Sequence, residues 1–160
     1  MGVIVMKTMK DRYNDILKKG YKIRDELQQF CKDAWAIQQE AGSIMSTYIG
    51  RYFKVRKPYY YNKKLGNLEY FVILELPKTM DYGSPNHLMY DYSRTPAYGI
   101  FSNGLPIRCL ISLYVFDPLS DKKFDELYEE ISEDEFINAI QGAVRNYTKS
   151  NFGGTNNEDV

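Results

Sequence analysis

Residues 9–48 read MKDRYNDILKKGYKIRDELQQFCKDAWAIQQEAGSIMSTY, and apolar or small residues recur in them at alternating steps of four and three. We call these positions the heptad seam. Its members are Met9, Tyr13, Ile16, Gly20, Ile23, Leu27, Phe30, Ala34, Ile37, Ala41, Ile44 and Tyr48. A seven-residue period is typical of an α-helix that keeps one face against a partner. The sequence therefore predicts that about a quarter of the chain is helical.

The length of this region leaves two structural alternatives open. As one rod, residues 8–49 would be roughly 60 Å long, more than the width of a compact domain of this size. The run Lys18-Lys19-Gly20 is typical of a helix end, which favours a break near Gly20, whereas the seven-residue phase continues through Gly20 without a shift.

The partner of the helix is also left open by the sequence. Leu17, Cys31 and Met45 widen the apolar face beyond the narrow seam of a two-stranded coiled coil. We therefore expect the helix to pack on the core of its own domain, with a homodimer through the N-terminal helix as the alternative. Trp35 lies off the seam and needs a neighbour elsewhere.

Beyond Gly50 the pattern changes to the alternation of β-strands. We expect strands over 51–61, with an edge position or a bulge at Pro58, over 68–76, and over 107–116 at the centre of the sheet. Two helices, over 120–131 and 132–147, follow. The predicted fold is α+β: a long N-terminal helix on an antiparallel sheet of about three strands, then two C-terminal helices. Residues 1–148 form one domain and 149–160 a disordered polar tail.

Composition limits the classes of function. The chain has 160 residues, 21 basic and 21 acidic side chains and two cysteines that are far apart. A net charge of zero means that any contact with nucleic acid must be local, and two scattered cysteines indicate buried thiols of a cytoplasmic protein. No apolar stretch is long enough for a membrane span, so we expect no membrane association.

One segment combines cations with aromatic rings. Residues 51–64 carry six cations and no acid, interleaved with tyrosines. Cations beside exposed rings can hold phosphates while bases stack, although the same residues also suit an edge strand protected against pairing. The candidate ligand-binding residues here are Arg51, Lys54, Arg56, Lys57, Tyr59, Tyr60, Tyr61, Lys63 and Lys64.

The region 79–106 is the longest stretch without a clear pattern. Long irregular connections in compact domains are often binding loops, but tyrosine-anchored surface loops look the same in sequence. Its candidate ligand-binding residues are Tyr82, His87, Tyr90, Tyr92 and Arg94.

Residues 117–135 carry nine acids and two lysines. A charged run of this kind is usually a solvated face. If it met the basic strand of another protomer, the chains would assemble head to tail.

Catalytic and metal-binding signatures are weak. His87 is the single histidine and has no recognisable nucleophile beside it, and one histidine with two cysteines cannot complete a four-ligand metal shell. We expect no catalytic residues, no metal and no cofactor.

The sequence favours a non-enzymatic binding protein for a phosphate-bearing ligand, a nucleic acid or a nucleotide. The alternative is a protein-protein adaptor or inhibitor, of the kind that phages and mobile elements encode, with tyrosine anchors and acidic helices.

Overall fold

The computed structural model describes residues 6–81 and 87–153. The elements follow in the order α1 (Met9–Ser46), β1 (Tyr52–Asn62), β2 (Gly66–Ile73), β3 (Thr79–Asp81), β4 (Leu88–Tyr90), the 3-10 turn η1 (Tyr92–Arg94), β5 (Thr95–Phe101), β6 (Ile107–Ile111), the 3-10 turn η2 (Tyr114–Phe116), α2 (Phe124–Leu127), β7 (Tyr128–Ile131) and α3 (Glu133–Asn151). The α+β class predicted from the sequence is confirmed.

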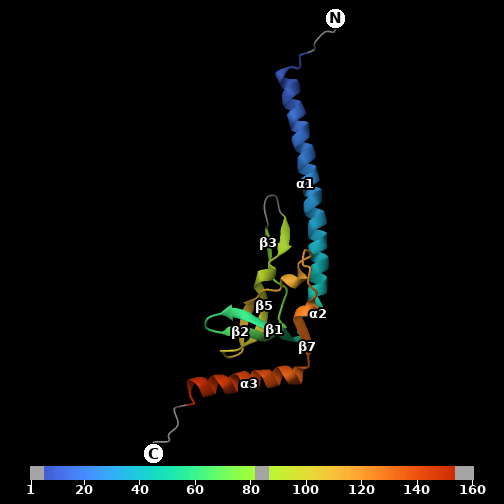
Figure 1. Ribbon diagram of the computed structural model, residues 1–160. Coiled ribbons are helices and arrows are strands. Elements are labelled where there is room, and N and C mark those ends of the chain that lie inside the picture. The colour runs from blue at the N-terminus through green and yellow to red at the C-terminus, as the bar shows by residue number, and fades with distance from the viewer. Residues whose placement is uncertain (1–5, 82–86, 154–160) are drawn as a thin grey trace, which may run out of the picture.

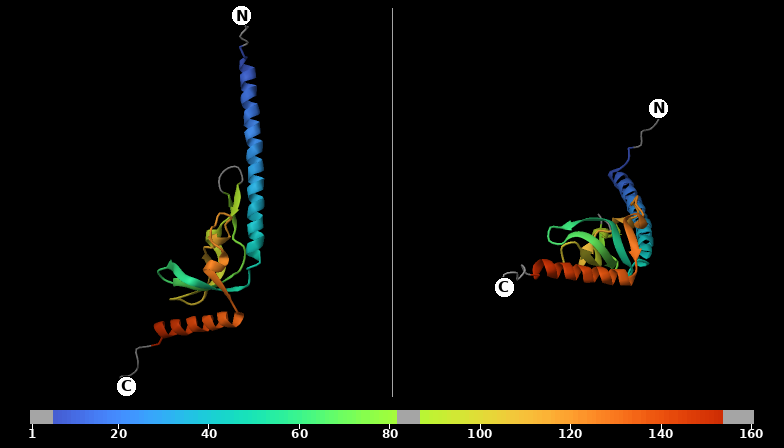
Figure 2. Two further views of the ribbon diagram at one scale, coloured as in Figure 1. Left: turned by 45° about the vertical axis from the view of Figure 1, so that its right-hand side comes forward. Right: turned by 60° about the horizontal axis from the view of Figure 1, so that its bottom comes forward.

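Helix α1 is a single rod of 38 residues that projects far beyond the sheet (Figures 1 and 2). Thr8 caps it, since its hydroxyl accepts from the Asp11 amide while the Asp11 carboxylate accepts from the Thr8 amide. The helix passes through Gly20 without a break, so of the two sequence alternatives the continuous one holds. Intrahelical hydrogen bonds tolerate a single glycine at a cost of about 1 kcal/mol.

The domain covers only the C-terminal part of α1. Ala41, Gly42 and Met45 are buried against it, and Trp35 packs on the Tyr90 ring at 5.6 Å between centroids. Most of the heptad seam is exposed to solvent. The expectation that the seam packs on the chain's own core is therefore wrong for most of its length, because the sheet is shorter than the helix.

The main sheet has five antiparallel strands in the order β6-β5-β2-β1-β7, and β3 and β4 form a separate hairpin. One face carries the larger core, with Phe53, Phe71, Phe101 and Tyr92 packed under the end of α1. The other face packs on α3 through Val72, Ile100 and Phe136, among others. The sheet is thus a middle layer between the α1 end and α3 (Figure 1).

Strand β1 pairs with β2 on one side and, through Tyr52–Val55, with β7 on the other. The β1–β2 register shifts between Lys54 and Tyr59, which confirms the bulge expected at Pro58. β1 is internal as far as Val55, and only its later part is an edge.

The region 79–106 is not an irregular loop. It contains β3, β4, η1 and β5, and β5 lies inside the main sheet between β2 and β6. Pro96 and Gly99 lie within β5, and because both residue types are unfavourable in strands the sequence pattern did not indicate this strand. Gly99 lies against the Cys109 sulfur.

Two further expectations are wrong in detail. The strand predicted over 107–116 ends at Ile111 as β6 and lies at the edge of the sheet, with Leu110 exposed. The helix predicted over 120–131 is a four-residue helix, α2, followed by strand β7.

The last helix begins as predicted. The Ser132 hydroxyl accepts from the Glu135 amide. Its end differs, because α3 includes Lys149–Asn151, expected to belong to the polar tail, whereas 154–160 lie outside the described residues.

Candidate anion-binding pocket

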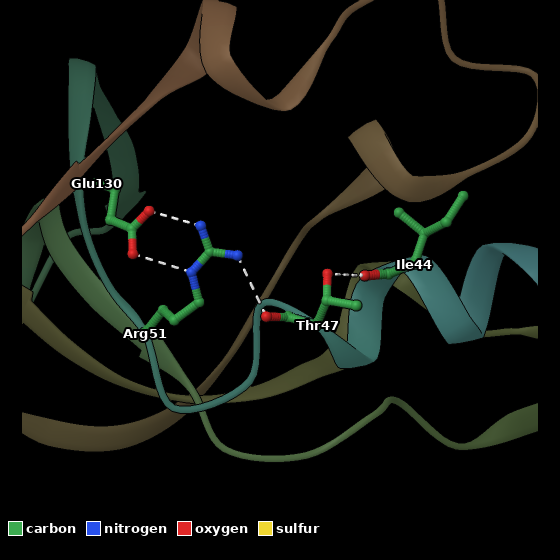
Figure 3. A network of polar contacts seen from close by, with 4 residues as sticks. All are labelled: Ile44, Thr47, Arg51 and Glu130. Carbon is green, nitrogen blue, oxygen red and sulfur yellow. Dashed lines mark hydrogen bonds and ion pairs between the residues drawn. The ribbon is translucent and has the colours of Figure 1, made fainter.

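The basic stretch of β1 does not form one continuous surface. Its first member, Arg51, is already engaged: its guanidinium donates to both carboxylate oxygens of Glu130 and, through Nη1, to the Thr47 carbonyl at 3.2 Å (Figure 3). Through these contacts Arg51 connects the end of α1, the start of β1 and β7. Its role in the fold is structural.

Arg56 and Lys57 lie where β7 no longer accompanies β1. The register with β7 ends at Val55 and the register with β2 resumes at Tyr59, so both residues fall outside the two ladders. In place of β7 stands the short helix α2, which Arg56 contacts by donating from Nε to the Asp125 carbonyl at 2.7 Å. This change of partner opens a hollow between β1 and α2.

We call this hollow the β1–α2 pocket. It measures about 400 Å³, and eight residues line it: Val55, Arg56, Lys57, Tyr59, Lys122, Glu126, Leu127 and Tyr128. Three cations and one carboxylate face it, and the Arg56 guanidinium lies 3.9 Å from a further carboxylate, Glu129. The pocket therefore has an excess of positive charge on an apolar and aromatic floor.

Two tyrosines, Tyr59 and Tyr128, belong to this lining. The Tyr59 hydroxyl is buried and, among the described residues, has no hydrogen-bond partner of ordinary geometry, although it lies close enough to Tyr128 for each to affect the other's titration. Burial raises the pKa of both phenols, so both are neutral donors at physiological pH.

The other candidates on β1 are dispersed. Lys54 is exposed, and Lys63 and Lys64 occupy the exposed β1–β2 turn. Tyr61 donates to the Leu110 carbonyl at 2.9 Å and its ring contacts Phe101, while Tyr60 is 67% exposed. Only Tyr60 of the three consecutive tyrosines is free to stack on a ligand.

The candidates of the 79–106 region also separate. Tyr82 lies outside the described residues, and the His87 ring contacts Phe30 of α1 at 5.2 Å. Tyr90 packs on α1, and Tyr92 is 1% exposed and donates to the Gln38 side chain at 2.6 Å. Tyr90 and Tyr92 thus attach the end of α1 to the sheet.

Arg94 lines a different cavity, of about 560 Å³, beside the β5–β6 edge. Its guanidinium lies 3.8 Å from Asp91, and the neighbouring Arg108 lies 3.3 Å from Glu75. Both arginines in this cavity have a carboxylate beside them, and Lys78 adds a third cation, so the excess of one positive charge equals that of the β1–α2 pocket with Glu129 included. The hypothesis that the β1 stretch and the 79–106 region form a single ligand surface has no support in these positions.

The acidic run lies beside the basic stretch of the same chain. β7 pairs with β1, with Glu129 opposite Lys54 and Glu130 opposite Phe53. These two acids of the run therefore lie against the basic stretch of their own protomer, and the head-to-tail assembly considered from the sequence stays a prediction.

Sequence reasoning missed Lys122 and Tyr128 as pocket residues. Both lie more than 60 residues from Arg56 in sequence, in a segment predicted as one amphipathic helix. The sequence feature that could have indicated this pocket is Pro58 in β1, because a bulge next to it interrupts strand pairing and leaves room for another element.

Other features of the described residues bear on function. No group of three or more histidine, cysteine, aspartate or glutamate side chains within 6–81 and 87–153 could hold a metal ion. No helix in the same part of the chain is long and apolar enough to cross a membrane. Comparison with protein-family models, curated proteins and solved structures finds no match to this chain.

Proposed function

We propose that this protein is a non-enzymatic binding protein that takes a phosphate-bearing ligand into the β1–α2 pocket. The carrying observation is that Arg56, Lys57 and Lys122, from two segments remote in sequence, line one hollow together with Tyr59 and Tyr128. Phosphate oxygens accept hydrogen bonds and carry the negative charge that this excess of cations favours.

The size of the pocket supports a small ligand. A volume of about 400 Å³ is within the range of small-molecule sites. A single-stranded nucleic acid requires successive exposed rings, and of the β1 tyrosines only Tyr60 is largely exposed. A nucleotide or another small phosphate ester is therefore favoured over a nucleic acid.

The test is isothermal titration calorimetry of the full chain with ATP and with inorganic phosphate. We expect Lys57→Glu and Lys122→Glu each to weaken binding at least tenfold, and binding to weaken with added salt. Lys63→Glu is the matched control, because it makes the same charge change in the same basic stretch but outside the pocket. Equal loss in all three variants, or no binding of either probe, would contradict the proposal.

The alternative function, a protein-protein adaptor, draws on a separate observation, the exposed apolar face of α1. Salt-tolerant binding of a protein partner that survives Lys57→Glu would favour it. The β1–α2 pocket would then be incidental to function.

A further inference from the structure

The exposed part of the heptad seam is the largest apolar feature that the domain leaves uncovered in the described residues. Ile23 is 64% exposed, Phe30 51% and Ile44 58%. The domain covers the neighbouring side of the helix, through Gln38, Gly42 and Met45, and leaves the seam accessible beside it. A helix of this kind gains most of its stability from burial of its apolar face, which here requires a second chain.

We propose that the seam binds the seam of a second copy of this chain, antiparallel, with the partner's Phe30 against Gly20. The proposal is independent of the pocket described above. It rests on three properties of the seam: residue size, charge order and the groove in which the seam ends.

Residue sizes are complementary in this arrangement. With the partner's Phe30 against Gly20, the partner's Ala34 lies against Ile16 and the partner's Ala41 against Met9. Leu27 meets the partner's Ile23, and Tyr13 meets the partner's Ile37. Three of these five layers set a large side chain against a small one, which favours close knobs-into-holes packing, and the other two pair large apolar side chains. A parallel pair would instead place Gly20 on Gly20 and Phe30 on Phe30.

The charges flanking the seam change sign along the helix. On one flank Arg12 and Lys19 precede Asp33 and Glu40. The antiparallel register sets Arg12 beside the partner's Glu40 and Lys19 beside the partner's Asp33, twice each by symmetry. A parallel dimer sets Lys19 beside the partner's Arg24, a repulsion, and gains no attractive pair on these flanks.

At the two-fold axis of this dimer, Arg24 lies beside the partner's Arg24 and Glu26 lies beside the partner's Glu26, so two pairs of like charge form there. Each of these residues already has an opposite charge on its own helix, because Arg24 lies 3.3 Å from Asp25 and Glu26 lies 3.9 Å from Lys22. These internal pairs reduce the repulsion at the axis.

The seam ends in a mostly apolar groove. This hollow of about 240 Å³ is lined by Ile37, Glu40, Ala41 and Ile44 of α1, by Val115 and Phe116 of η2 and by the following Pro118. The register brings the partner's Met9 against Ala41, so the start of the partner's helix occupies this groove. The two domains then lie at opposite ends of the paired helices, because each domain is attached at the C-terminal end of its own rod (Figure 2).

The experiment is sedimentation equilibrium of the full chain with charge-reversal variants. We expect a dimer that Lys19→Glu weakens roughly tenfold and Asp33→Lys weakens similarly, while the double variant K19E/D33K recovers the wild-type affinity. A parallel dimer predicts the opposite sign for Lys19→Glu, which would gain a pair with Arg24, and an antiparallel dimer shifted by one heptad predicts no rescue.

Lys18→Glu is the matched control, because Lys18 and Lys19 both lie near Asp15 but Lys18 points away from the seam. It should leave the dimer unchanged. Ile23→Asn should yield a folded monomer, verified by circular dichroism. A monomer at all concentrations for the wild type, or a failed rescue, would overturn the proposal.

Spin-label distances give the orientation independently. The labels are introduced into a Cys31→Ser, Cys109→Ser background. In the antiparallel dimer the two labels at Asp25→Cys lie at the same position along the axis. The two labels at Lys18→Cys are instead displaced from each other by roughly 20 Å along the axis. Equal distances for the two sites would indicate a parallel dimer and contradict the proposal.

Discussion

The Arg51 guanidinium forms a two-pronged ion pair with the Glu130 carboxylate, with Nε 2.9 Å from one oxygen and Nη2 2.5 Å from the other. The pair joins two strands that are separated by 79 positions in sequence. The same guanidinium also holds the Thr47 carbonyl beyond the last turn of α1 (Figure 3). It therefore couples the angle at which α1 leaves the domain to the pairing of β1 with β7.

This pair makes stability depend on pH. The hydrogen bond and charge of Arg51 lower the pKa of Glu130 in the folded state, so the contribution is present above the ordinary carboxyl pKa and is lost as the pH falls through the lowered value. We expect the difference in unfolding free energy between wild type and Glu130→Gln to be largest near pH 7 and to shrink below about pH 4. Urea unfolding across this range measures it, and a difference that grows on acidification would contradict it.

A double-mutant cycle isolates the interaction. Arg51→Ala should destabilise the wild type more than it destabilises Glu130→Ala, since the second variant has already lost the pair. Arg56→Ala is a comparison variant, because the Arg56 guanidinium is 3.9 Å from Glu129 and its coupling to that carboxylate should be smaller.

Tyr59→Phe should change stability by less than about 1 kcal/mol, because the buried Tyr59 hydroxyl meets Tyr128 without the geometry of a full hydrogen bond. Tyr61→Phe is the control, since its hydroxyl donates to the Leu110 carbonyl and its loss should destabilise by about 1 kcal/mol. Thermal and urea unfolding measure both. A clear destabilisation by Tyr59→Phe would show that the contact with Tyr128 is a full hydrogen bond.

Burial of the phenols predicts loss of stability in alkali. The pKa values of Tyr59, Tyr92 and Tyr128 are all raised in the folded state, mainly by desolvation. Above about pH 10 the unfolded chain releases phenolic protons that the folded chain retains, so stability falls as the pH rises. Absorbance of tyrosinate should increase together with unfolding, not before it, for these three residues.

Cys109 should react slowly with alkylating reagents. Burial raises the pKa of its thiol to about 11, so little thiolate is present at pH 8. In a Cys31→Ser background we expect alkylation by iodoacetamide about 100-fold slower than for the unfolded chain, a factor that follows from a pKa two units higher. Equal rates in folded and unfolded protein would contradict the burial of this residue.

Met45 anchors α1 to the domain, because its side chain is fully buried in the main core. Met45→Ala should lower the unfolding free energy by about 2–4 kcal/mol through the cavity it leaves. Leu119→Ala, at a position 90% exposed, is the control and should have almost no effect. Urea unfolding of both variants measures the contrast.

Several elements were predictable because their signals are local. The Ser132 cap, the heptad seam and the alternation in β1 and β2 all depend on neighbouring residues. β5 and β7 were not predictable in this way. Pro96 and Gly99 disfavour a strand locally, and the spacing of Phe124, Leu127, Tyr128 and Ile131 fits a helix, but pairing with β2 and with β1 outweighs these propensities.

The candidate site shows the same division. The sequence indicated that Arg56, Lys57 and Tyr59 could contact a phosphate, because cations and rings alternate there. It could not indicate Lys122 and Tyr128, which reach the pocket only because α2 replaces β7 beside the bulged part of β1.

The sequence by itself indicated a helical region with a continuous apolar seam over residues 9–48, since periodicity acts over a few residues, but it left a break near Gly20 open. Only the tertiary structure decided what that seam contacts. The sheet is short, so the domain buries Ala41 and Met45 and leaves the earlier turns of the seam in solvent. Which residues become core depends on how far the packed layers extend, and that distance is set by pairing between strands remote in sequence.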